Sequence, residues 1–395
     1  MYYLIGTDEA GYGPNLGPLA VTATLWKIED DVLAPDALYS VLEPVISASA
    51  GKKVAIPIAD SKKLHKHENL QPLEMGIFAA LEALKHVGSV DLSKKYAECD
   101  CFINAQNPLN FPISSVELCD FFCGSETAPL RAAVPWHSAE TEEILPKNLP
   151  CERVSELGVL FLRTLSEHGI TLLGIRSALI FPAEFNTEVE ACGSKGVFLS
   201  DTTMRLIVYF WEEVQKRSIT QEKTAENEPK NVLENTTKKV LGNIAGNATE
   251  NVTGNVVENV TKMEVEPPEV RVFCDKHGGR NFYLPTLMDF FPNLPFCVVE
   301  EGRNFSEYIH YGSQNALRIR FQAKGETLLP VALASMVSKY LREVSMSRFN
   351  RWWEREIPGI RPTAGYPLDA KRFRAEISEK MEEMKLNWSE VWRNR

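Results

Sequence analysis

Apolar residues follow two different periods along this chain. Runs rich in apolar and β-branched residues predict strands, and they cover residues 2–7, 19–26, 172–181, 270–274, 296–300 and 316–322. Apolar positions three and four residues apart predict helices over residues 72–86, 158–168, 202–214 and 330–344. A further amphipathic helix is predicted near the C-terminus, with its apolar face at Ile377, Met381, Met384, Trp388 and Val391. The order of these elements indicates an α/β fold with a helical C-terminal part.

Residues 217–269 depart from this pattern. The stretch is rich in Asn, Glu, Thr and Lys, contains no aromatic residue, and repeats Asn at every fourth position over much of its length. That period could draw a weak stripe along a helix, but Gly242, Gly246 and Gly254 favour an extended or fluctuating insert. Such a composition cannot bury a core.

Composition narrows the class of protein. The chain has 395 residues, 44% of them hydrophobic, and 43 Lys and Arg against 53 Asp and Glu, a net charge of −10. These values exclude a disordered or fibrous chain and argue against indiscriminate coating of nucleic acid, while leaving room for a local basic groove. The N-terminal residues lack the basic start of a signal peptide, and no apolar run is long enough to span a bilayer. We therefore expect a cytoplasmic protein without a membrane partner.

The eight cysteines do not form a disulfide framework in so long a chain. Cys99, Cys101, Cys119 and Cys123 could bind zinc, but a Cys-x-Cys pair combined with a Cys-x3-Cys pair is not a standard zinc spacing. We interpret them as reduced, partly buried thiols.

The densest chemical signal is the sequence TDEAGYGPNLGPL. A predicted strand ends in two consecutive carboxylates, Asp8 and Glu9, and a loop rich in Gly and Pro follows. A polar strand end before a tight turn would explain an isolated Asp-Glu pair, but adjacent carboxylates repel each other, and a divalent cation turns that repulsion into attraction. The glycines that follow let backbone amides approach a ligand. A dinucleotide-binding loop is disfavoured by the acidic pair and by Pro14 within the loop.

Two weaker clusters follow. In ADSKKL, Ser61, Lys62 and Lys63 suit a phosphodiester backbone, although a solvated lysine pair also explains such a run. The strand VRVFC delivers Asp275 next to glycines and cationic side chains, which suits metal or phosphate chemistry as well as a capping turn. His277 could act on a leaving group or a phosphate, or be merely exposed.

A fourth cluster surrounds the helix predicted to begin at residue 330. Glu326 precedes that helix, and Ser335, Lys339 and Arg342 are spaced by four and three residues, so they share one helix face. A solvated polar stripe is the alternative interpretation.

The segment that continues from this helix is basic. Residues 339–374 contain nine Lys or Arg and four Asp or Glu, a local charge of +5 in an acidic protein. Trp352, Trp353 and Tyr366 are interleaved with these charges, a pattern that could grip a nucleic-acid backbone.

Together these clusters resemble the motifs of type 2 ribonuclease H, also called ribonuclease HII. The resemblance rests on TDEAGYGPNLGPL, ADSKKL, VRVFCDKHGG, KGETLLPVALASMVSKYLRE and TAGYPLDAKRF, which occur in the family's order. It implies a ribonuclease H-like mixed sheet flanked by helices, with a helical C-terminal extension. We expect a catalytic domain of residues 1–216 and 270–345, with 91–150 as a family-atypical insertion and 217–269 as the Asn-rich insert. Residues 346–395 would form the extension.

The resemblance also implies the roles of individual residues. Four carboxylates match the family's metal ligands: Asp8, Glu9, Asp275 and Glu326. The family usually has Asp where Glu326 stands. Its glycine-arginine-glycine loop, which recognises the ribose 2′-hydroxyl and nearby backbone, is here Gly11-Tyr12-Gly13. The arginine's contact is lost, whereas backbone contacts can remain.

Further substrate-binding residues are predicted from the same motifs. Tyr366 matches the family tyrosine that packs against the sugar at the RNA to DNA junction, and Leu368 replaces a threonine common in the family. Phosphate-facing lysines of the family are matched by Lys62, Lys63 and Lys339. Their neighbours Ser61, Ser335 and Arg342 complete the predicted substrate-binding set.

The resemblance predicts a metal-dependent endonuclease. It would hydrolyse the RNA strand of RNA/DNA hybrids, or cut duplex DNA 5′ of an embedded ribonucleotide, by two-metal phosphodiester hydrolysis. The all-oxygen ligand set favours Mg2+ or Mn2+. Two alternatives stay open: a ribonuclease H-like protein with an altered substrate or with nucleic-acid binding only, and a small phosphate- or nucleotide-binding protein. No protein partner can be inferred.

Overall fold

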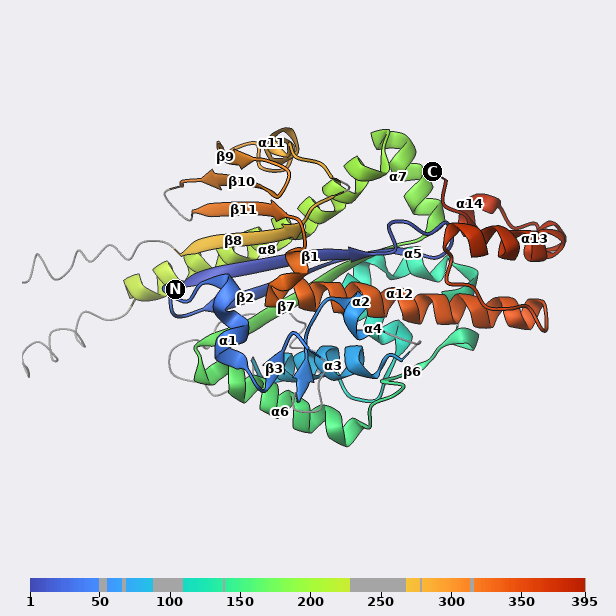
Figure 1. Cartoon of the computed structure of the whole chain (residues 1–395), viewed down its shortest axis with the longest axis horizontal. Coiled ribbons are helices and arrows are strands. Elements are labelled where there is room, and N and C mark those ends of the chain that lie inside the picture. Colours follow the sequence, from blue (N-terminus) through green and yellow to red (C-terminus); the bar gives the residue numbers. More distant parts are fainter. Residues whose placement is uncertain are drawn as a thin grey trace, which may run out of the picture.

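A seven-stranded sheet forms the centre of the molecule (Figure 1). The computed structural model describes residues 1–49, 55–65, 69–87, 109–137, 139–227, 268–277, 279–312 and 316–394. The strands of the sheet are β1 (Tyr2–Ala10), β2 (Leu19–Ile28), β7 (Ile170–Ile180), β8 (Glu269–Asp275), β9 (Cys297–Glu301), β10 (Phe305–His310) and β11 (Leu317–Gln322). Two small sheets pair β3 (Ile46–Ser47) with β4 (Ile56–Pro57), and β5 (Ile113–Ser114) with β6 (Ile144–Leu145).

The strand order of the large sheet is β7-β2-β1-β8-β11-β10-β9. β1 pairs antiparallel with β2 and parallel with β8, and β8 pairs parallel with β11. The carboxyl ends of β1, β8 and β11 therefore meet at one edge of the sheet. In open α/β sheets, ligands bind outside the carboxyl ends of parallel strands. The acidic motifs of the sequence end at this edge.

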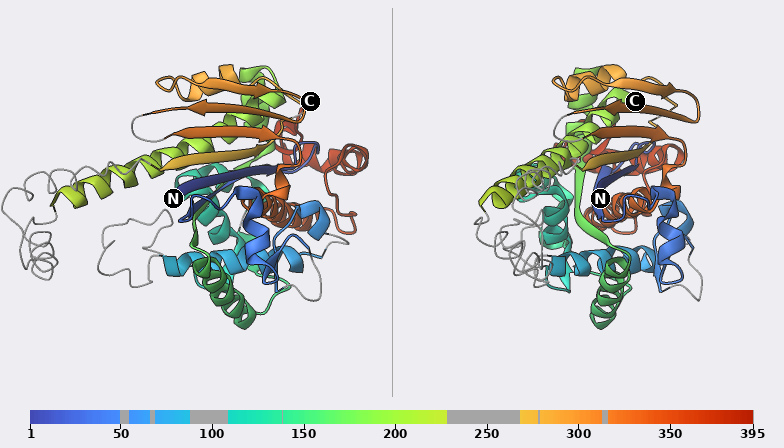
Figure 2. Two further views of the ribbon diagram at one scale, coloured as in Figure 1. Left: turned by 60° about the vertical axis from the view of Figure 1, so that its left-hand side comes forward. Right: turned by 90° about the vertical axis from the view of Figure 1, so that its left-hand side faces the viewer.

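Helices cover both faces of the sheet (Figure 2). On one face, α3 (Gln71–Val87), α6 (Cys151–Glu167) and α12 (Leu329–Glu356) share an apolar cluster with the strands. On the other face, α7 (Pro182–Cys192), α8 (Lys195–Asn227) and α11 (Leu284–Phe290) do the same. The other helices are α1 (Leu38–Leu42), α2 (Ser61–Leu64), α4 (Ser115–Cys123), α5 (Ala128–Ala132), α13 (Pro367–Met384) and α14 (Trp388–Val391). Short 3₁₀ turns are η1 (Pro35–Ala37), η2 (Ser125–Thr127), η3 (Pro135–His137), η4 (Ala139–Thr141) and η5 (Gly325–Thr327).

β1 is buried on both faces and carries the start of α12. Successive side chains alternate between the two apolar clusters, so that Leu4 packs with α3 and α12 while Ile5 packs with α8. Gly6 lies where α12 begins, and a Cβ at this position would be 2.4 Å from the carbonyl carbon of Pro330. Only glycine allows this close approach. Because Gly6 has no side chain, the first turn of α12 can pack directly against the strand that carries Asp8.

A third apolar cluster holds the C-terminal extension together. Phe349 and Trp353 on the second half of α12 pack against Phe373 of α13. Trp136 of η3 joins them, with its ring centroid 4.9 Å from that of Phe349. Figure 1 shows α12, α13 and α14 extending beyond the sheet at the right.

The fold class predicted from the sequence is confirmed: a mixed sheet flanked by helices, with a helical C-terminal extension. The pattern missed α7 and β10, and α6 begins at Cys151 rather than at 158. α12 continues to Glu356 instead of ending near 344, because most of its positions are buried and no continuous polar face marks its length. The single predicted C-terminal helix is in fact two helices. α13 ends at Met384 because Lys385 adopts a left-handed φ of 56°, and α14 begins at Trp388.

The Asn-rich insert begins in a helix. α8 continues to Asn227, so its last residues contradict the extended conformation predicted from 217 onward. Residues 228–267 lie outside the described residues, as do Cys99 and Cys101. α12 runs through the predicted domain boundary at 345, and the division into domains stays a prediction. Within the described ranges, no helix combines the length and the apolar character needed to cross a membrane.

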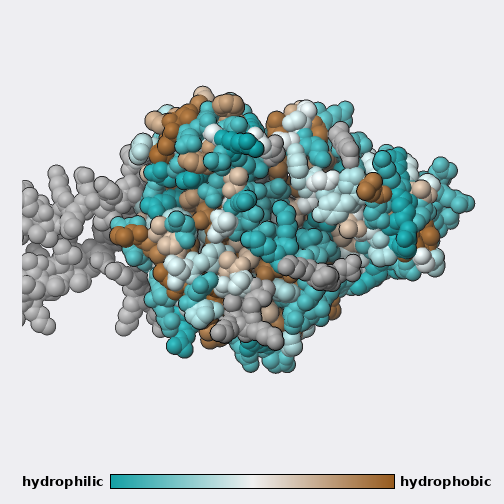
Figure 3. Space-filling model, in the orientation of Figure 1, coloured by the Kyte–Doolittle hydropathy of each residue, from teal (hydrophilic) through white to brown (hydrophobic). Residues whose placement is uncertain are grey.

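The surface in Figure 3 is largely hydrophilic, with apolar atoms at its upper corner over α11 and β9. Met288, Val298 and Val299 are exposed there. β9 is the edge strand of the sheet, so this corner combines apolar side chains with an open strand edge.

Candidate active site

The ends of β1 and β8 bring the first and third motifs together. β1 carries Asp8 and Glu9 among its last three residues, and β8 ends at Asp275. The parallel register pairs Thr7 with Cys274, so Asp8 and Asp275 are the next residues on adjacent strands. Residues more than 260 positions apart in the sequence thus meet at one sheet edge.

Glu326 reaches the same edge from the turn after β11. The Gly325 N–H donates a 3.1 Å hydrogen bond to Oδ1 of Asp275, and a Cβ on Gly325 would be 3.2 Å from the Asp275 backbone nitrogen. This contact holds η5 against the end of β8. All four carboxylates predicted to bind metal therefore come from elements that converge at this edge.

Burial and neighbouring carboxylates raise the pKa of two of these residues, Asp8 and Glu9. Burial raises the pKa of Asp8 well above its usual range, and the neighbouring charge of Glu9 raises it further. Burial and then the charge of Asp275 raise the pKa of Glu9 to about 7, with a smaller contribution from Glu326. Like charges that are buried together are unfavourable unless a proton or a cation neutralises them. The edge is therefore suited to bind positive charge.

Serines of α12 fix the end of β1. The Ser338 hydroxyl lies 3.0 Å from the Asp8 carbonyl oxygen, to which it donates, and 2.7 Å from the Thr22 hydroxyl. Ser335 donates a hydrogen bond to the Asp8 carboxylate, which partly offsets the rise of its pKa. The Ser335 Oγ also lies 3.1 Å from that of Ser61. Ser61 and Ser335 are both buried and join α2 to α12 behind the carboxylates.

α2 places a cation beside the carboxylates. Asp60 caps this short helix by accepting a 2.9 Å hydrogen bond from the Lys62 N–H. Partial burial lowers the pKa of Lys62, but the charges of Asp60, Asp8 and Glu326 outweigh it, so the pKa lies above its ordinary value. Lys62 is therefore charged and within electrostatic reach of the site. Lys63 is exposed beside it.

The glycine loop lies on a buried arginine. Gly11 has a φ of +90°, and a Cβ there would be 2.6 Å from Nε of Arg342. Arg342 is buried rather than part of a solvated stripe, and it donates a 2.8 Å hydrogen bond to the Ala364 carbonyl oxygen. Tyr12 turns toward α8, where Nζ of Lys195 lies 5.0 Å from its ring centroid. The loop backbone thus packs on Arg342, while the side chain of Tyr12 packs toward Lys195 of α8.

The segment before α13 lies beside the glycine loop. The Asn15 N–H donates a 2.8 Å hydrogen bond to the Gly365 carbonyl oxygen. The next residue, Tyr366, is 52% exposed, and its ring centroid is 5.8 Å from the Arg342 guanidinium carbon. The structure therefore brings together Gly11, Arg342 and Tyr366, which the sequence predicted as substrate-binding residues.

A second C-terminal segment supports the loop. Leu16 forms a β-bridge with Trp392, and the Arg393 N–H donates a 2.8 Å hydrogen bond to the Asn15 carbonyl oxygen. Arg393 is buried, and burial together with the charge of Arg342 lowers its pKa to about 9. This supporting residue was not predicted, because no motif or periodicity in the sequence distinguishes Arg393 from its neighbours. Ser338 was also missed, although its position three residues after Ser335 places it on the same helix face.

Three residues considered for chemistry are buried in structural roles. Trp352 and Trp353 are 7% and 0% exposed in the C-terminal cluster, so they cannot grip a nucleic-acid backbone as predicted for the basic segment. His277 is buried, with Nδ1 3.0 Å from the Ser200 hydroxyl, and burial lowers its pKa to about 3. It is therefore neutral and enclosed, which contradicts both interpretations made from the sequence.

The buried surroundings of the two thiols of α4 keep them protonated and unreactive. Cys119 and Cys123 are free and buried, and burial raises their pKa to about 11 and about 12. Protonated thiols in an apolar core match the interpretation as reduced thiols rather than zinc ligands.

The carboxylates fit Mg2+ or Mn2+ by their chemistry, since both ions prefer oxygen ligands. In the described part of the chain, no three His, Cys, Asp or Glu side chains lie close enough to share one ion. Chelation by several of these carboxylates therefore requires rotation of their side chains. The metal site stays a prediction that the donor set and the repulsion between Asp8 and Glu9 support.

No protein-family model matches the chain, and no curated protein matches it. Among solved structures, it resembles a chain of the PCNA:RNase HII complex from Archaeoglobus fulgidus, with 13% identity, a TM-score of 0.36, and coverage of 99% of this chain and 94% of that chain. Ribonuclease H2 from Pyrococcus horikoshii OT3 is 11% identical with a TM-score of 0.29, and the match covers 98% of this chain and 92% of that chain. Bst-RNase HIII in complex with Mn2+ is 12% identical with a TM-score of 0.31, and the match covers 99% of this chain and 66% of that chain. These identities and TM-scores are low, so function has to be inferred from the residues of the site.

Proposed function

We propose that this chain is a metal-dependent endonuclease that hydrolyses the RNA strand of RNA/DNA hybrids, or cuts duplex DNA 5′ of an embedded ribonucleotide. The observation that carries the proposal is the convergence of carboxylates from three distant motifs at the carboxyl ends of β1 and β8 and in η5. Two of them, Asp8 and Glu9, have raised pKa values because they are buried beside like charges. Such an arrangement is costly for the fold alone and is typical of a functional site.

Four carboxylates would hold Mg2+ or Mn2+: Asp8, Glu9, Asp275 and Glu326. When bound by such ligands, these ions supply an activated water and stabilise charge on the leaving oxygen. The chain's own residues prepare this site. Ser335 orients the Asp8 carboxylate through its hydrogen bond. Lys62 adds a positive charge at the rim, where a non-bridging phosphate oxygen can bind.

The substrate would lie along the rim formed by the glycine loop, α2 and Tyr366. The exposed ring of Tyr366 suits packing against a sugar, and the open backbone around Gly13 suits close approach. Lys62 and Lys63 are exposed and suit phosphates. Lys339 is paired with Glu343 at 2.6 Å, so a phosphate would have to compete for it.

The test is cleavage of three labelled duplexes in Mg2+ and in Mn2+. One is DNA with a single ribonucleotide, one is an RNA/DNA hybrid, and one is all DNA. The Asp8→Asn protein, prepared in parallel, excludes a contaminating nuclease. Cutting of the two ribose-containing duplexes only, lost in Asp8→Asn, supports the proposal.

Two other results would assign the alternatives. Binding of the hybrid without cutting in either metal would make the protein a nucleic-acid-binding protein, and cutting of the all-DNA duplex would indicate an altered substrate. Tight binding of a mononucleotide without affinity for any duplex would favour the small-phosphate alternative.

A further inference from the structure

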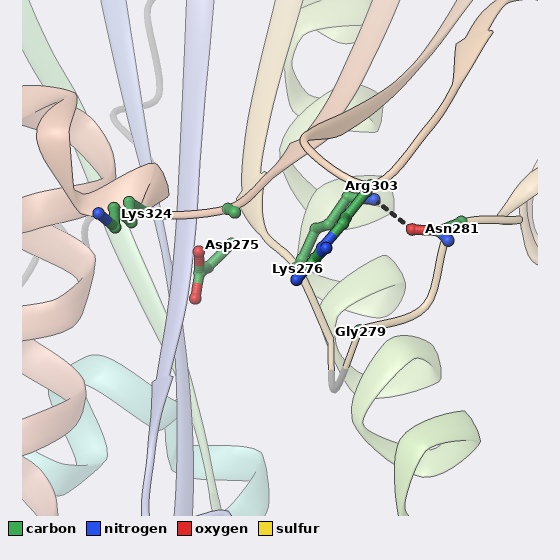
Figure 4. A pocket seen from close by; sticks show the side chains of 7 residues that line it. Asp275, Lys276, Gly279, Asn281, Arg303 and Lys324 are labelled. Atoms are coloured by element: carbon green, nitrogen blue, oxygen red, sulfur yellow. Dashed lines mark hydrogen bonds between the residues drawn. The ribbon is translucent and has the colours of Figure 1, made fainter.

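A pocket of about 530 Å³ opens on the β11 side of Asp275 (Figure 4). It is formed by the ends of β8 and β11, by the loop after β8, and by the turn between β9 and β10. Its charged and polar lining consists of Asp275, Lys276, Asn281, Arg303 and Lys324. Asp275 therefore belongs both to the carboxylate edge and to this pocket.

Lys276 is fixed in the pocket wall by neutral partners. Its Nζ donates to Oδ1 of Asn281 at 2.8 Å and to the Gly302 carbonyl oxygen, and lies 3.4 Å from the Ser306 hydroxyl. None of these acceptors carries a charge. They therefore hold the ammonium group in place without neutralising it.

Two exposed cations complete the lining. Arg303 comes from the turn between β9 and β10. Lys324 is the second residue after β11, and its positive φ of 61° turns the chain toward η5. Across the ranges the structure describes, neither of them forms an ion pair with a carboxylate, and nor does Lys276. The pocket thus concentrates three positive charges around a concave surface with one acidic residue at its border.

Three cations without a carboxylate partner around one hollow attract an anion, and the exposed groups of Arg303 and Lys324 are donors that match phosphate oxygens. The neighbouring carboxylates narrow the choice of anion. Because both sites share Asp275 and open at the same sheet edge, a continuous chain of phosphates lying along that edge meets both. A free phosphate compound would use the pocket alone.

We propose that this pocket binds a phosphodiester of the nucleic acid adjacent to the one that is cut. The inference rests on the proposed function, since it requires a nucleic-acid strand to lie across the carboxylates. It adds a strand-positioning site made of Lys276, Arg303 and Lys324, which no motif of the sequence pointed to as a group.

The test measures binding of an RNA/DNA hybrid by the full-length Asp8→Asn protein, so that the duplex stays intact. The pocket variant adds Arg303→Gln and Lys324→Gln, which remove exposed charges without touching the anchored Lys276. The matched control adds Arg163→Gln and Lys385→Gln. Arg163 is an exposed arginine of α6, and Lys385, like Lys324, is an exposed lysine with a positive φ, here 56°.

Each protein is titrated with hybrids that carry one neutral methylphosphonate, moved position by position along both strands. We expect the pocket variant to bind the unmodified hybrid about tenfold more weakly and to lower the slope of log affinity against log salt by about one. One methylphosphonate position should weaken the parent protein by a similar factor and leave the pocket variant unaffected, because the same contact is already lost. The control should behave as its parent does.

The opposite outcomes are distinct. If every methylphosphonate weakens the parent and the pocket variant equally, the pocket inference is overturned, while cleavage by the wild-type chain still supports the proposed function. If the wild-type chain neither binds nor cuts any duplex, both proposals fail. Binding of tripolyphosphate that is lost in the pocket variant, without any effect of the variant on duplex binding, would assign the pocket to a free phosphate compound and overturn the inference.

Discussion

Two carboxylates in this molecule, Glu74 and Asp8, differ in what surrounds them. Glu74 of α3 is fully buried and accepts hydrogen bonds of 2.7 Å from the backbone N–H groups of Lys147 and Asn148. The Tyr340 hydroxyl donates a third bond at 2.9 Å. These three donors stabilise the charge of Glu74, and the bonds tie a loop to two helices.

Asp8 has the opposite surroundings. Its pKa is raised by burial and by the charges of Glu9 and Asp275, and hydrogen bonds from the Ser335 side chain and from the Glu9 N–H, at 2.8 Å, only partly counteract them. A buried carboxylate whose charge is balanced by three hydrogen bonds from the chain serves the fold. One that faces other carboxylates leaves a role for a cation from outside, so the difference separates a structural acid from a functional one.

Replacing the functional acid should have the largest effect. Asp8→Asn is expected to lower cleavage of a ribonucleotide-containing duplex by roughly a thousandfold or more, since a metal-bound transition state is stabilised by several kcal/mol. The free energy of unfolding should rise by about 1 kcal/mol, because one of several repelling charges is removed. Single-turnover cleavage and urea unfolding measure the two effects. The exposed Asp31→Asn is the control, and equal activity of both variants would contradict the assignment.

The structural acid should show the reverse. Glu74→Gln is expected to lower the free energy of unfolding by about 3 kcal/mol, because the Gln amide group faces donors that the carboxylate had satisfied. Cleavage per folded molecule should be unchanged. Urea unfolding and active-site-normalised rates test this pair of expectations. A loss of activity without a loss of stability would remove the distinction between the two carboxylates.

A buried histidine extends the comparison to pH. Burial, with the charges of Arg348 and Arg131, lowers the pKa of His137 to about 3, so the folded protein holds it neutral. His137 takes up a proton near pH 6.5 in the unfolded chain, so its contribution to stability falls by about 2 kcal/mol between pH 7 and pH 5. His277, whose pKa is also about 3, adds a loss of the same kind in both proteins compared below. Urea unfolding of the wild-type chain and of His137→Gln measures the effect. The same slope in both proteins would show that other groups cause it.

The smallest effect concerns the rim of the functional site. Tyr366→Ala is expected to raise KM for a ribonucleotide-containing duplex about tenfold, because an aromatic face that packs on a nucleotide contributes about 1–3 kcal/mol. Tyr366→Phe should restore most of this loss, since the ring and not the hydroxyl makes the contact. Steady-state kinetics compare the two variants. A change in unfolding free energy with no change in KM would place Tyr366 with the structural residues.

Local patterns in the sequence located the strands that carry the acidic motifs. The apolar runs before Asp8 and Asp275 predicted β1 and β8, because buried strands have a dense apolar signature. Their adjacency did not follow from any local signal, since it depends on parallel pairing across almost the whole chain. The resemblance to ribonuclease HII supplied the expectation that these residues meet.

Other features depend on packing that no local pattern contains. Trp352 and Trp353 lie in a basic segment, yet the cluster formed with α13 buries them. Arg342 and Ser335 occupy a polar stripe that faces β1 and the glycine loop rather than water. Composition identified these residues as polar or aromatic, but only the tertiary fold decides which of them can reach a ligand.

The support of the glycine loop by Trp392 and Arg393 also has a consequence for the order of synthesis. Asn15 leaves the ribosome well before Arg393, which lies 378 residues later, yet the Asn15 carbonyl oxygen and side chain are both hydrogen-bonded to the Arg393 backbone. The loop that borders the carboxylates therefore cannot take its final support until Arg393 has been made. A nascent chain that contains Asn15 but not yet Arg393 should carry this loop without its support.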